Sequence, residues 1–141
     1  MFLAAPAIAS AATDYVCQSG QTGPGGTPCA FSTVGAVNSA SLGSGDTVEF
    51  YAGDTFTDDT LYPESGVTYT SYVPTGSSAT MGIIKPPAGS SGVDLYGGIS
   101  NATVQNLDFE GGSYTTSTAD GAATSDCCGN NLNDTLKNNT F

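Results

Sequence analysis

Apolar and polar residues alternate in short runs along most of this chain, and Gly, Pro, Asp and Ser bound each run. Residues 45–56 place Val48 and Phe50 on one side, and residues 65–73 set Val67 and Tyr69 against neighbouring threonines. Alternation of this kind, broken every few residues, is typical of short strands joined by turns. The pattern predicts strands within 45–56, 65–73, 80–87, 91–98 and 102–109, with a long loop at 110–130.

One segment follows a different period. In residues 31–42 the apolar positions Phe31, Val34 and Val37 recur in steps of three, which fits a short amphipathic helix. Ser32 or Thr33 is suited to the N-cap, and a glycine at 43 follows the expected end. The sequence therefore predicts one helix, preceded by a Gly- and Pro-rich lead-in at 14–30.

Two segments repeat one pattern. NATVQNLDF (101–109) and NDTLKNNTF (133–141) share Asn-x-Thr-(Val/Leu)-x-Asn-x-x-Phe, and Ser-Gly pairs at 44–45, 65–66 and 91–92 open three expected strands. Repeats at intervals of about 20–50 residues are typical of solenoids, in which each unit buries its apolar face against the next. The class predicted is therefore all-β, a parallel β-helix with a short N-terminal capping helix.

The repeat also predicts which side chains stack. Val104 should lie over Leu136, and Phe109 over Phe141, inside the fold. Asn106 and Asn138 should occupy corners, because asparagine tolerates left-handed dihedrals and its amide can bond to an identical amide in the next layer.

Composition removes several classes of function. The chain of 141 residues has two lysines, no arginine, histidine or tryptophan, and a formal net charge of -11. Without histidine there is no imidazole base and no histidine-ligated metal. Without a cluster of basic residues there is no footprint for nucleic acid.

The N-terminus and the cysteines indicate export. The apolar start ends in Ala9-Ser10-Ala11, which suits signal-peptidase cleavage, so 1–11 is interpreted as a signal-peptide remnant and 12–141 as one domain. No segment is apolar enough to span a membrane. Cys17 and Cys29 bracket a flexible loop that a disulfide could close, while the partners of the adjacent pair at 127–128 stay open. Sequons begin at Asn101, Asn133 and Asn138.

The helix, the following GSGDTVEFYAGDTFTD and the segments ending SNATVQNLDFEGG and NDTLKNNTF together resemble the N-terminal part of secreted right-handed parallel β-helix proteins. These form the pectate-lyase-like superfamily of polysaccharide lyases, glycoside hydrolases and related surface proteins. The resemblance implies that residues 12–44 are a lead-in and cap and that 45–141 are coils, incomplete at the C-terminus. It specifies architecture more than activity, because this fold hosts many chemistries.

Acidic residues gather between 46 and 64. Asp46, Asp54, Asp58 and Asp59 carry hard oxygen ligands, so calcium is a candidate cofactor, although neither an EF-hand loop nor a nonapeptide calcium loop is present. The alternative is that Asp46 and Asp54 serve turns and that the others keep the surface soluble.

Three further candidates have ordinary alternatives. A carboxylate pair from Asp94, Asp108 and Glu110 would suit glycoside hydrolysis, but acids also pair by chance. Lys85 could serve a lyase, yet a lone lysine beside two prolines more often protects a strand end. Strand tyrosines could stack on sugar rings, or be ordinary half-buried residues. No catalytic residue is assigned.

The predicted function is carbohydrate-associated and extracellular: the N-terminal coils of a polysaccharide lyase, a glycoside hydrolase or a polysaccharide-binding scaffold, with any catalytic residues outside this segment. The alternative is a structural subunit of a filament or surface fibre. In that case the open end of the β-helix would self-associate by end-to-end stacking.

Overall fold

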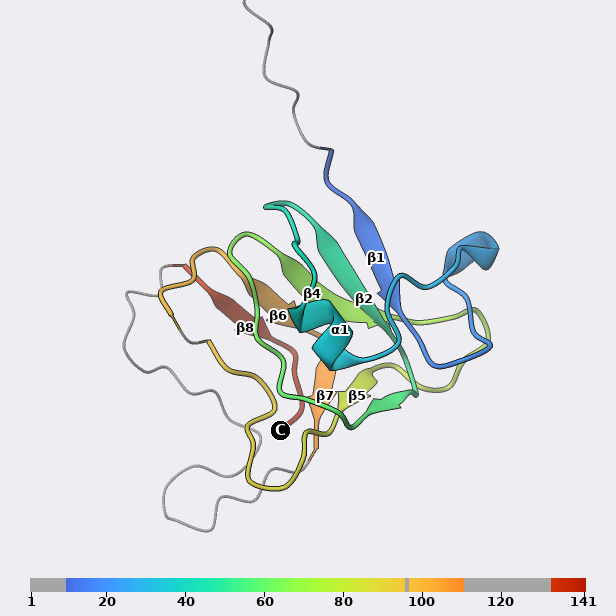
Figure 1. Cartoon of the computed structure of the whole chain (residues 1–141). Helices are drawn as coiled ribbons and strands as arrows, with labels where there is room; N and C mark the ends of the chain where they lie inside the picture. Colours follow the sequence, from blue (N-terminus) through green and yellow to red (C-terminus); the bar gives the residue numbers. More distant parts are fainter. Residues whose placement is uncertain (1–9, 96, 111–132) are drawn as a thin grey trace, which may run out of the picture.

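The computed structural model describes residues 10–95, 97–110 and 133–141. These residues form mostly short strands in parallel sheets with very little helix, so the fold is all-β (Figure 1). The strands are β1 Thr13–Val16, β2 Thr47–Tyr51, β3 Thr55–Phe56, β4 Thr68–Tyr72, β5 Gly82–Ile84, β6 Thr103–Gln105, β7 Leu107–Phe109 and β8 Thr135–Lys137. The helices are α1 Val34–Asn38 and a single 3-10 turn, η1 Pro24–Gly26.

The strands form two sheets in which every pair is parallel. One sheet has the order β1-β2-β4-β6-β8, and the other has the order β3-β5-β7. From β2 onward the chain alternates between the sheets, so each strand of the larger sheet lies beside the one that follows it after a crossover (Figure 1).

Two of the expected strands are split by corners. The run at 45–56 becomes β2 and β3, because Gly53 turns the chain with a φ of 92°. The run at 102–109 becomes β6 and β7, because Asn106 takes a φ of 55°. The alternation located the apolar faces of both runs. The corner at Asn106 agrees with the prediction from the repeat, whereas the corner at Gly53 was not predicted.

Two other expectations about strands were wrong. No strand forms in the described part of 91–98, where Val93 makes only an isolated bridge to Leu61. The Ser91-Gly92 pair does not open a strand of the larger sheet. The turn at Gly66 is instead followed in the next layer by the turn at Ser100, whose carbonyl accepts a hydrogen bond from the Gly66 N–H. Conversely, β1 lies within the lead-in, where no strand was expected.

Left-handed residues mark the entry to each later strand of the larger sheet. Gly45, Gly66, Asn101 and Asn133 stand two residues before the first threonine of β2, β4, β6 and β8, and all have positive φ. Glycine and asparagine are the residues that adopt this conformation at least cost. The entry turns therefore share one backbone geometry although their sequence spacing varies.

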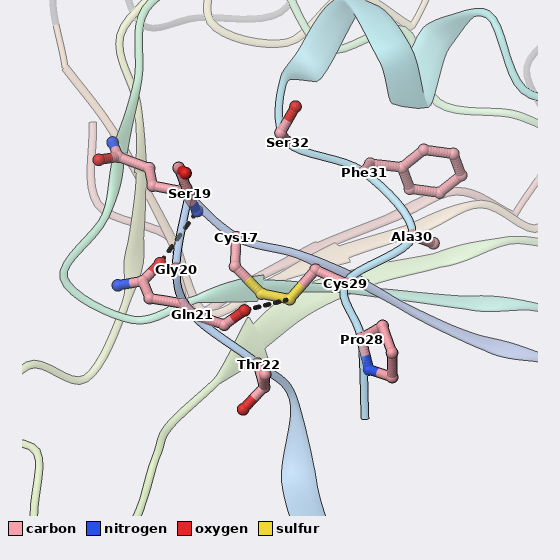
Figure 2. A pocket seen from close by; sticks show the side chains of 11 residues that line it. Cys17, Ser19, Gly20, Gln21, Thr22, Pro28, Cys29, Ala30, Phe31 and Ser32 are labelled. Atoms are coloured by element: carbon pink, nitrogen blue, oxygen red, sulfur yellow. Dashed lines mark hydrogen bonds between the residues drawn. A yellow bond between two sulfur atoms is a disulfide. The ribbon is translucent and has the colours of Figure 1, made fainter. Parts of the chain in front are cut away.

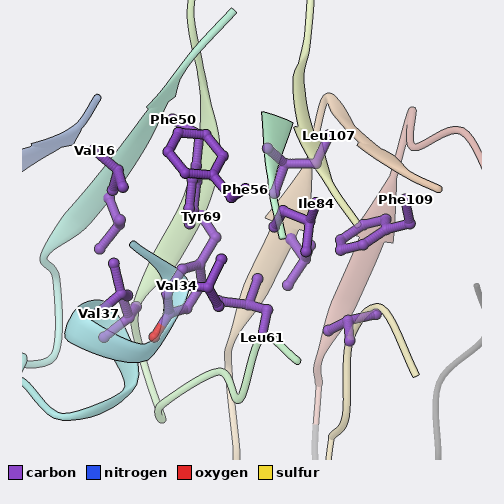
Figure 3. Packing of buried hydrophobic residues seen from close by; sticks show 14 of the residues in the cluster. Val16, Val34, Val37, Phe50, Phe56, Leu61, Tyr69, Ile84, Leu107 and Phe109 are labelled. Atoms are coloured by element: carbon purple, nitrogen blue, oxygen red, sulfur yellow. The ribbon is translucent and has the colours of Figure 1, made fainter. Parts of the chain in front are cut away.

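The core lies between the two sheets and α1 (Figure 3). Phe50 from β2 is fully buried and meets Phe56 from β3 edge-on, with ring centroids 5.3 Å apart. Tyr69 from β4 is also buried, and its hydroxyl oxygen accepts a hydrogen bond of 3.0 Å from the Glu64 N–H. Burial raises the pKa of Tyr69 to about 12, so the phenol stays neutral within the core.

The helix is shorter than expected and ends at Asn38 rather than near residue 42. Val34 and Val37 are buried, whereas the Asn38 side chain leaves the helix to donate to Asp59 and to the carbonyl of Thr60. The side chain of Ser39 donates to the Gly35 carbonyl and helps to close the last turn. The hydrogen bonds of the Asn38 and Ser39 side chains thus favour the end of the helix just after its second buried valine.

The structure decides between the two candidate N-caps, Ser32 and Thr33. The Thr33 hydroxyl accepts from Ala36 N–H at 3.1 Å, which makes Thr33 the cap. Asp58, which follows β3, adds a second acceptor: its two carboxylate oxygens accept from Val34 N–H and Gly35 N–H at 3.0 and 2.7 Å. These bonds satisfy the first amide groups of α1.

We expect Thr33→Ala to lower the free energy of unfolding by about 1 kcal/mol, because it removes the side-chain acceptor of the cap. Ser32→Ala is the matched control, since Ser32 is exposed and adjacent but is not the cap, and it should change stability by less than about 0.5 kcal/mol. Urea unfolding followed by circular dichroism measures both variants. Equal losses would show that Thr33 is not the effective cap.

No helix among the described residues is long and apolar enough to cross a membrane. The expected signal remnant at 1–11 lies almost wholly outside the described residues, and so do the adjacent cysteines at 127–128 and most of the expected loop at 110–130.

Candidate functional site

A disulfide closes the lead-in that follows β1. Cys17 and Cys29 are bonded, with their Cα atoms 5.9 Å apart. The loop is also tied to the corner between β2 and β3, where Asp54 accepts from Gln18 N–H at 3.0 Å and from Gln21 Nε2 at 2.9 Å. Structural disulfides of this kind are typical of proteins that fold in oxidising compartments.

The disulfide loop borders a shallow cavity of about 470 Å³, lined by residues 17–22 and 28–32 (Figure 2). Its two glutamine side chains already have partners within the protein: Gln21 Oε1 accepts from Gln18 N–H, and Gln18 Nε2 donates to the carbonyl of Thr55. A ligand would have to compete with these bonds. The cavity therefore offers less for recognition than the neighbouring sheet face.

Three tyrosines gather on the outer face of the larger sheet. In β2 and β4, Val48, Phe50 and Tyr69 point into the core, so the alternate residues Tyr51 and Tyr72 point outward. The ring of Tyr72 lies edge-on to Tyr51 at 5.8 Å and edge-on to Tyr15 of β1 at 5.7 Å, measured between centroids. All three are partly exposed. We call Tyr15, Tyr51 and Tyr72 the tyrosine cluster.

The disulfide loop holds one member of the cluster in place. Gly23 lies so close to the Tyr15 ring that a Cβ at this position would come within 2.7 Å of Tyr15 Cγ. Glu49 of β2 is in register with Tyr15. Burial, and then the charge of Glu49, raises the pKa of Tyr15, while partial burial raises the pKa of Glu49. The Tyr15 phenol is therefore neutral and can act as a hydrogen-bond donor.

A row of threonines runs beside the cluster across all five strands of the larger sheet. Thr47 pairs in register with Thr13 and Thr68, and the row continues through Thr103 to Thr135. Neighbouring hydroxyls in such a row recur at the strand spacing of about 4.8 Å. The outer face of the sheet thus combines aromatic rings with regularly spaced hydroxyl groups.

The acids expected to bind calcium are not brought together. Asp46 accepts from Ala12 N–H at 2.8 Å and Gly43 N–H at 2.6 Å, and these bonds lower its pKa. Asp54, Asp58 and Asp59 each bind other amide donors. Among the described residues, no group of three or more His, Cys, Asp or Glu side chains is arranged to hold a metal ion. Calcium is therefore not part of the function proposed below.

Only some of the candidate catalytic side chains lie near one another. Lys85 Nζ lies 3.3 Å from Glu110 Oε2 in an ion pair whose partners are both about half exposed. Burial, and then the charge of Glu110, raises the pKa of Asp108. Asp94 follows the isolated bridge at Val93, outside the strands. The ion pair can link the ends of the neighbouring strands β5 and β7. It does not indicate a particular reaction.

The asparagines of the repeat stack as amide ladders. Asn138 Nδ2 donates to Asn106 Oδ1 at 3.4 Å, and both residues have left-handed dihedrals. A second ladder joins Asn133 Nδ2 to Asn101 Oδ1 at 3.5 Å. The sequons at Asn101, Asn133 and Asn138 thus fall on ladder residues, and their glycosylation stays a prediction.

The apolar positions of the repeat stack in register. Val104 pairs with Leu136 across β6 and β8. The rings of Phe109 and Phe141 are nearly parallel, with centroids 5.4 Å apart and an interplanar angle of 13°. These are the stacked pairs that the repeat predicts.

The tyrosine cluster was the feature that sequence reasoning did not assemble. Tyr51 and Tyr72 each lie in an expected strand run, but Tyr15 lies in the lead-in, where no strand was expected. The alternation of Tyr15 with buried Val16 is the only local signal of β1, and it is too short to be distinctive. Comparison with known protein families, curated proteins and solved structures finds no match to this chain.

Proposed function

We propose that this chain is an extracellular, right-handed parallel β-helix of the pectate-lyase-like kind that binds a neutral polysaccharide on the outer face of its larger sheet. The tyrosine cluster carries the proposal. The fold is supported by parallel pairing throughout both sheets and by alternation of the chain between them. Right-handed crossovers are strongly preferred between parallel strands.

Sugar rings have apolar faces and polar edges, and the outer face of the sheet offers a partner for each. Tyrosine rings supply rigid apolar area and a polar hydroxyl at their tips. In this cluster they come from three adjacent strands, β1, β2 and β4, so a polymer lying across the strands can meet them together. The Thr47–Thr68–Thr103 row adds hydroxyl groups along the same direction.

Charge favours a neutral ligand. The chain carries a formal charge of -11, and Glu49 lies within the proposed face. A polyanion such as a polyuronate would be repelled unless cations bridged it to the protein. Export is supported by the Cys17–Cys29 disulfide and by the expected signal remnant.

Tyr72→Ala is expected to weaken binding to insoluble or soluble neutral glucans, mannans and xylans at least tenfold, because Tyr72 contacts both other rings of the cluster. Affinity electrophoresis and pull-down on the insoluble polymers measure the loss. Tyrosine fluorescence gives a second readout, since the chain contains no tryptophan.

Tyr62→Ala is the matched control, because Tyr62 is 47% exposed and lies outside the cluster. It should bind like the unmodified chain. If no neutral polysaccharide binds, or if both variants lose affinity equally, the proposed face is not the binding site.

The described residues are expected to provide binding without turnover. Assays for reducing sugars and for ultraviolet-absorbing unsaturated products should be blank with the same polymers. Turnover that is lost in Asp108→Asn but retained in Tyr72→Ala would instead favour an acid-dependent activity near the Lys85–Glu110 pair.

A further inference from the structure

Glu49 is a charged residue beside the tyrosine cluster. It lies on β2, where Val48 and Phe50 point into the core, so its own side chain points to the outer face of the sheet. The side chain is only partly exposed, and this burial raises the pKa of its carboxyl group. Among the residues that the structure describes, no hydrogen bond or ion pair reaches this carboxylate. A partly buried charge without a partner costs free energy, and a ligand that brings a positive charge would recover it.

Two rings of the cluster meet on the outer face close to Glu49. Tyr15 and Tyr72 come from β1 and β4, which have β2 between them and so lie two strand spacings, about 9–10 Å, apart. Their ring centroids are only 5.7 Å apart, so the two rings lean toward each other across β2. Tyr15 is in register with Glu49, and the charge of Glu49 contributes to the raised pKa of Tyr15. The carboxylate therefore lies beside the point where the rings meet.

The angles between the rings suit a small cation. The planes of Tyr15 and Tyr72 make an angle of 72°, and those of Tyr51 and Tyr72 make an angle of 79°. Rings set at such angles can turn their faces toward one small group from two sides, whereas coplanar rings cannot. The face of an aromatic ring attracts an ammonium group, and a nearby carboxylate adds to that attraction. The cluster and Glu49 thus provide both elements of a site for an organic cation.

Neither lysine of the chain supplies this positive charge. Lys85 is paired with Glu110 at 3.3 Å. Lys137 is on β8, three strand spacings or about 14 Å from β2 in the larger sheet. A metal ion is a poor alternative, because one carboxylate offers too few ligands and the described residues contain no group of three or more His, Cys, Asp or Glu arranged to hold one.

We propose that Glu49 and the tyrosine cluster bind the ammonium group of an amino sugar, so that a polysaccharide with free amino groups is the preferred ligand of this face. The sugar ring would lie against the tyrosines while its ammonium group pairs with Glu49. The inference rests on the proposed function and ranks its ligands: polyanions are repelled, neutral polymers bind, and polymers that carry amino groups bind more tightly. The formal charge of -11 would also attract such a polycation over a longer range.

Three hexasaccharides of the same linkage test the ranking. Cellohexaose and the matching hexamers of N-acetylglucosamine and glucosamine differ at one ring carbon, which carries a hydroxyl, a neutral amide or an ammonium group. Isothermal titration calorimetry of the chain at low ionic strength should show at least tenfold tighter binding of the glucosamine hexamer than of the other two. The preference should shrink in high salt, which screens the charge pair.

Glu49→Gln should remove the preference, because it removes the charge and keeps the size of the side chain. The glucosamine hexamer should then bind within about threefold of cellohexaose, and the affinity for cellohexaose itself should change by less than about threefold. Glu64→Gln is the matched control. It changes the net charge equally, but Glu64 lies outside the strands, so the preference should persist. Circular dichroism checks that both variants fold.

Four results would overturn the inference. The unmodified chain could bind the three hexamers equally, or Glu49→Gln could keep the preference. Glu64→Gln could lose the preference as fully as Glu49→Gln, which would make net charge the cause. Pentalysine could bind as tightly as the glucosamine hexamer and depend equally on Glu49, which would make a basic peptide the occupant.

Failure of the proposed function gives a different result. If neutral polysaccharides do not bind but the glucosamine hexamer binds through Glu49, the neutral ligand is wrong and the ammonium site stands. If neutral polysaccharides bind through Tyr72 without any preference for the amino hexamer, the proposed function stands and the ammonium site is wrong. Binding of none of these ligands overturns both.

Discussion

Replacement of Phe50 by alanine is expected to lower the free energy of unfolding by about 3–5 kcal/mol. Phe50 of β2 is fully buried and packs edge-on against Phe56 of the other sheet. Truncation would remove the apolar burial of one ring and leave a cavity between the two sheets. A domain of this size is stable by only about 5–15 kcal/mol, so the variant should be near the limit of folding.

Phe141→Ala is the control for this effect. The same side chain is lost, but Phe141 is 58% exposed at the end of the stack and contacts Phe109 on one face. We expect a loss of about 1 kcal/mol or less. Urea unfolding monitored by circular dichroism measures both variants. Similar losses for the two would mean that the Phe141 ring is as buried as the Phe50 ring, against the exposures in the structure.

Loss of the disulfide is the second large effect expected. In the double variant Cys17→Ser with Cys29→Ser, the free energy of unfolding should fall by about 2–4 kcal/mol, because a closed loop limits the unfolded chain. The loop also places Gly23 against Tyr15. Under the proposed function, polysaccharide binding should therefore weaken several-fold even at low temperature, where the variant remains folded.

Gly23→Ala separates the two consequences. It keeps the disulfide but forces the loop away from the Tyr15 ring, because the added Cβ would lie 2.7 Å from Cγ. It should weaken polysaccharide binding with a smaller change in stability than the double variant. Unaltered binding in both, with circular dichroism confirming the fold, would remove the loop from the proposed site.

Much of the secondary structure could be predicted because it depends on local patterns. Val48 and Phe50 alternate with more exposed neighbours, and this alternation indicates a strand with one buried face. Ser32 and Thr33 both precede the two helical valines, so the sequence indicates an N-cap at one of them, and the structure shows that it is Thr33. The repeat at 101–109 and 133–141 predicted the stacking of Val104 on Leu136, since identical layers place identical residues in register.

The errors arose where pairing between distant segments decides the outcome. Ser91-Gly92 resembles Ser44-Gly45 and Ser65-Gly66, yet the hydrogen bond from Gly66 goes to Ser100. A dipeptide can specify a local turn. Long-range hydrogen bonds, however, determine which two turns stack on each other. β1 was missed for the same reason, because four residues acquire their strand character from pairing with β2.

By itself the sequence determined most strand faces, two candidates for the helix cap, the absence of imidazole and arginine chemistry, and the residues that stack in the repeat, because each depends on residue type and short spacing. Only the tertiary structure decided where the polar groups are used. It spread the four predicted calcium ligands over separate amide donors, and it joined Tyr15, Tyr51 and Tyr72 from three strands into one surface. Side chains distant in sequence become neighbours only through strand register, which no local pattern encodes.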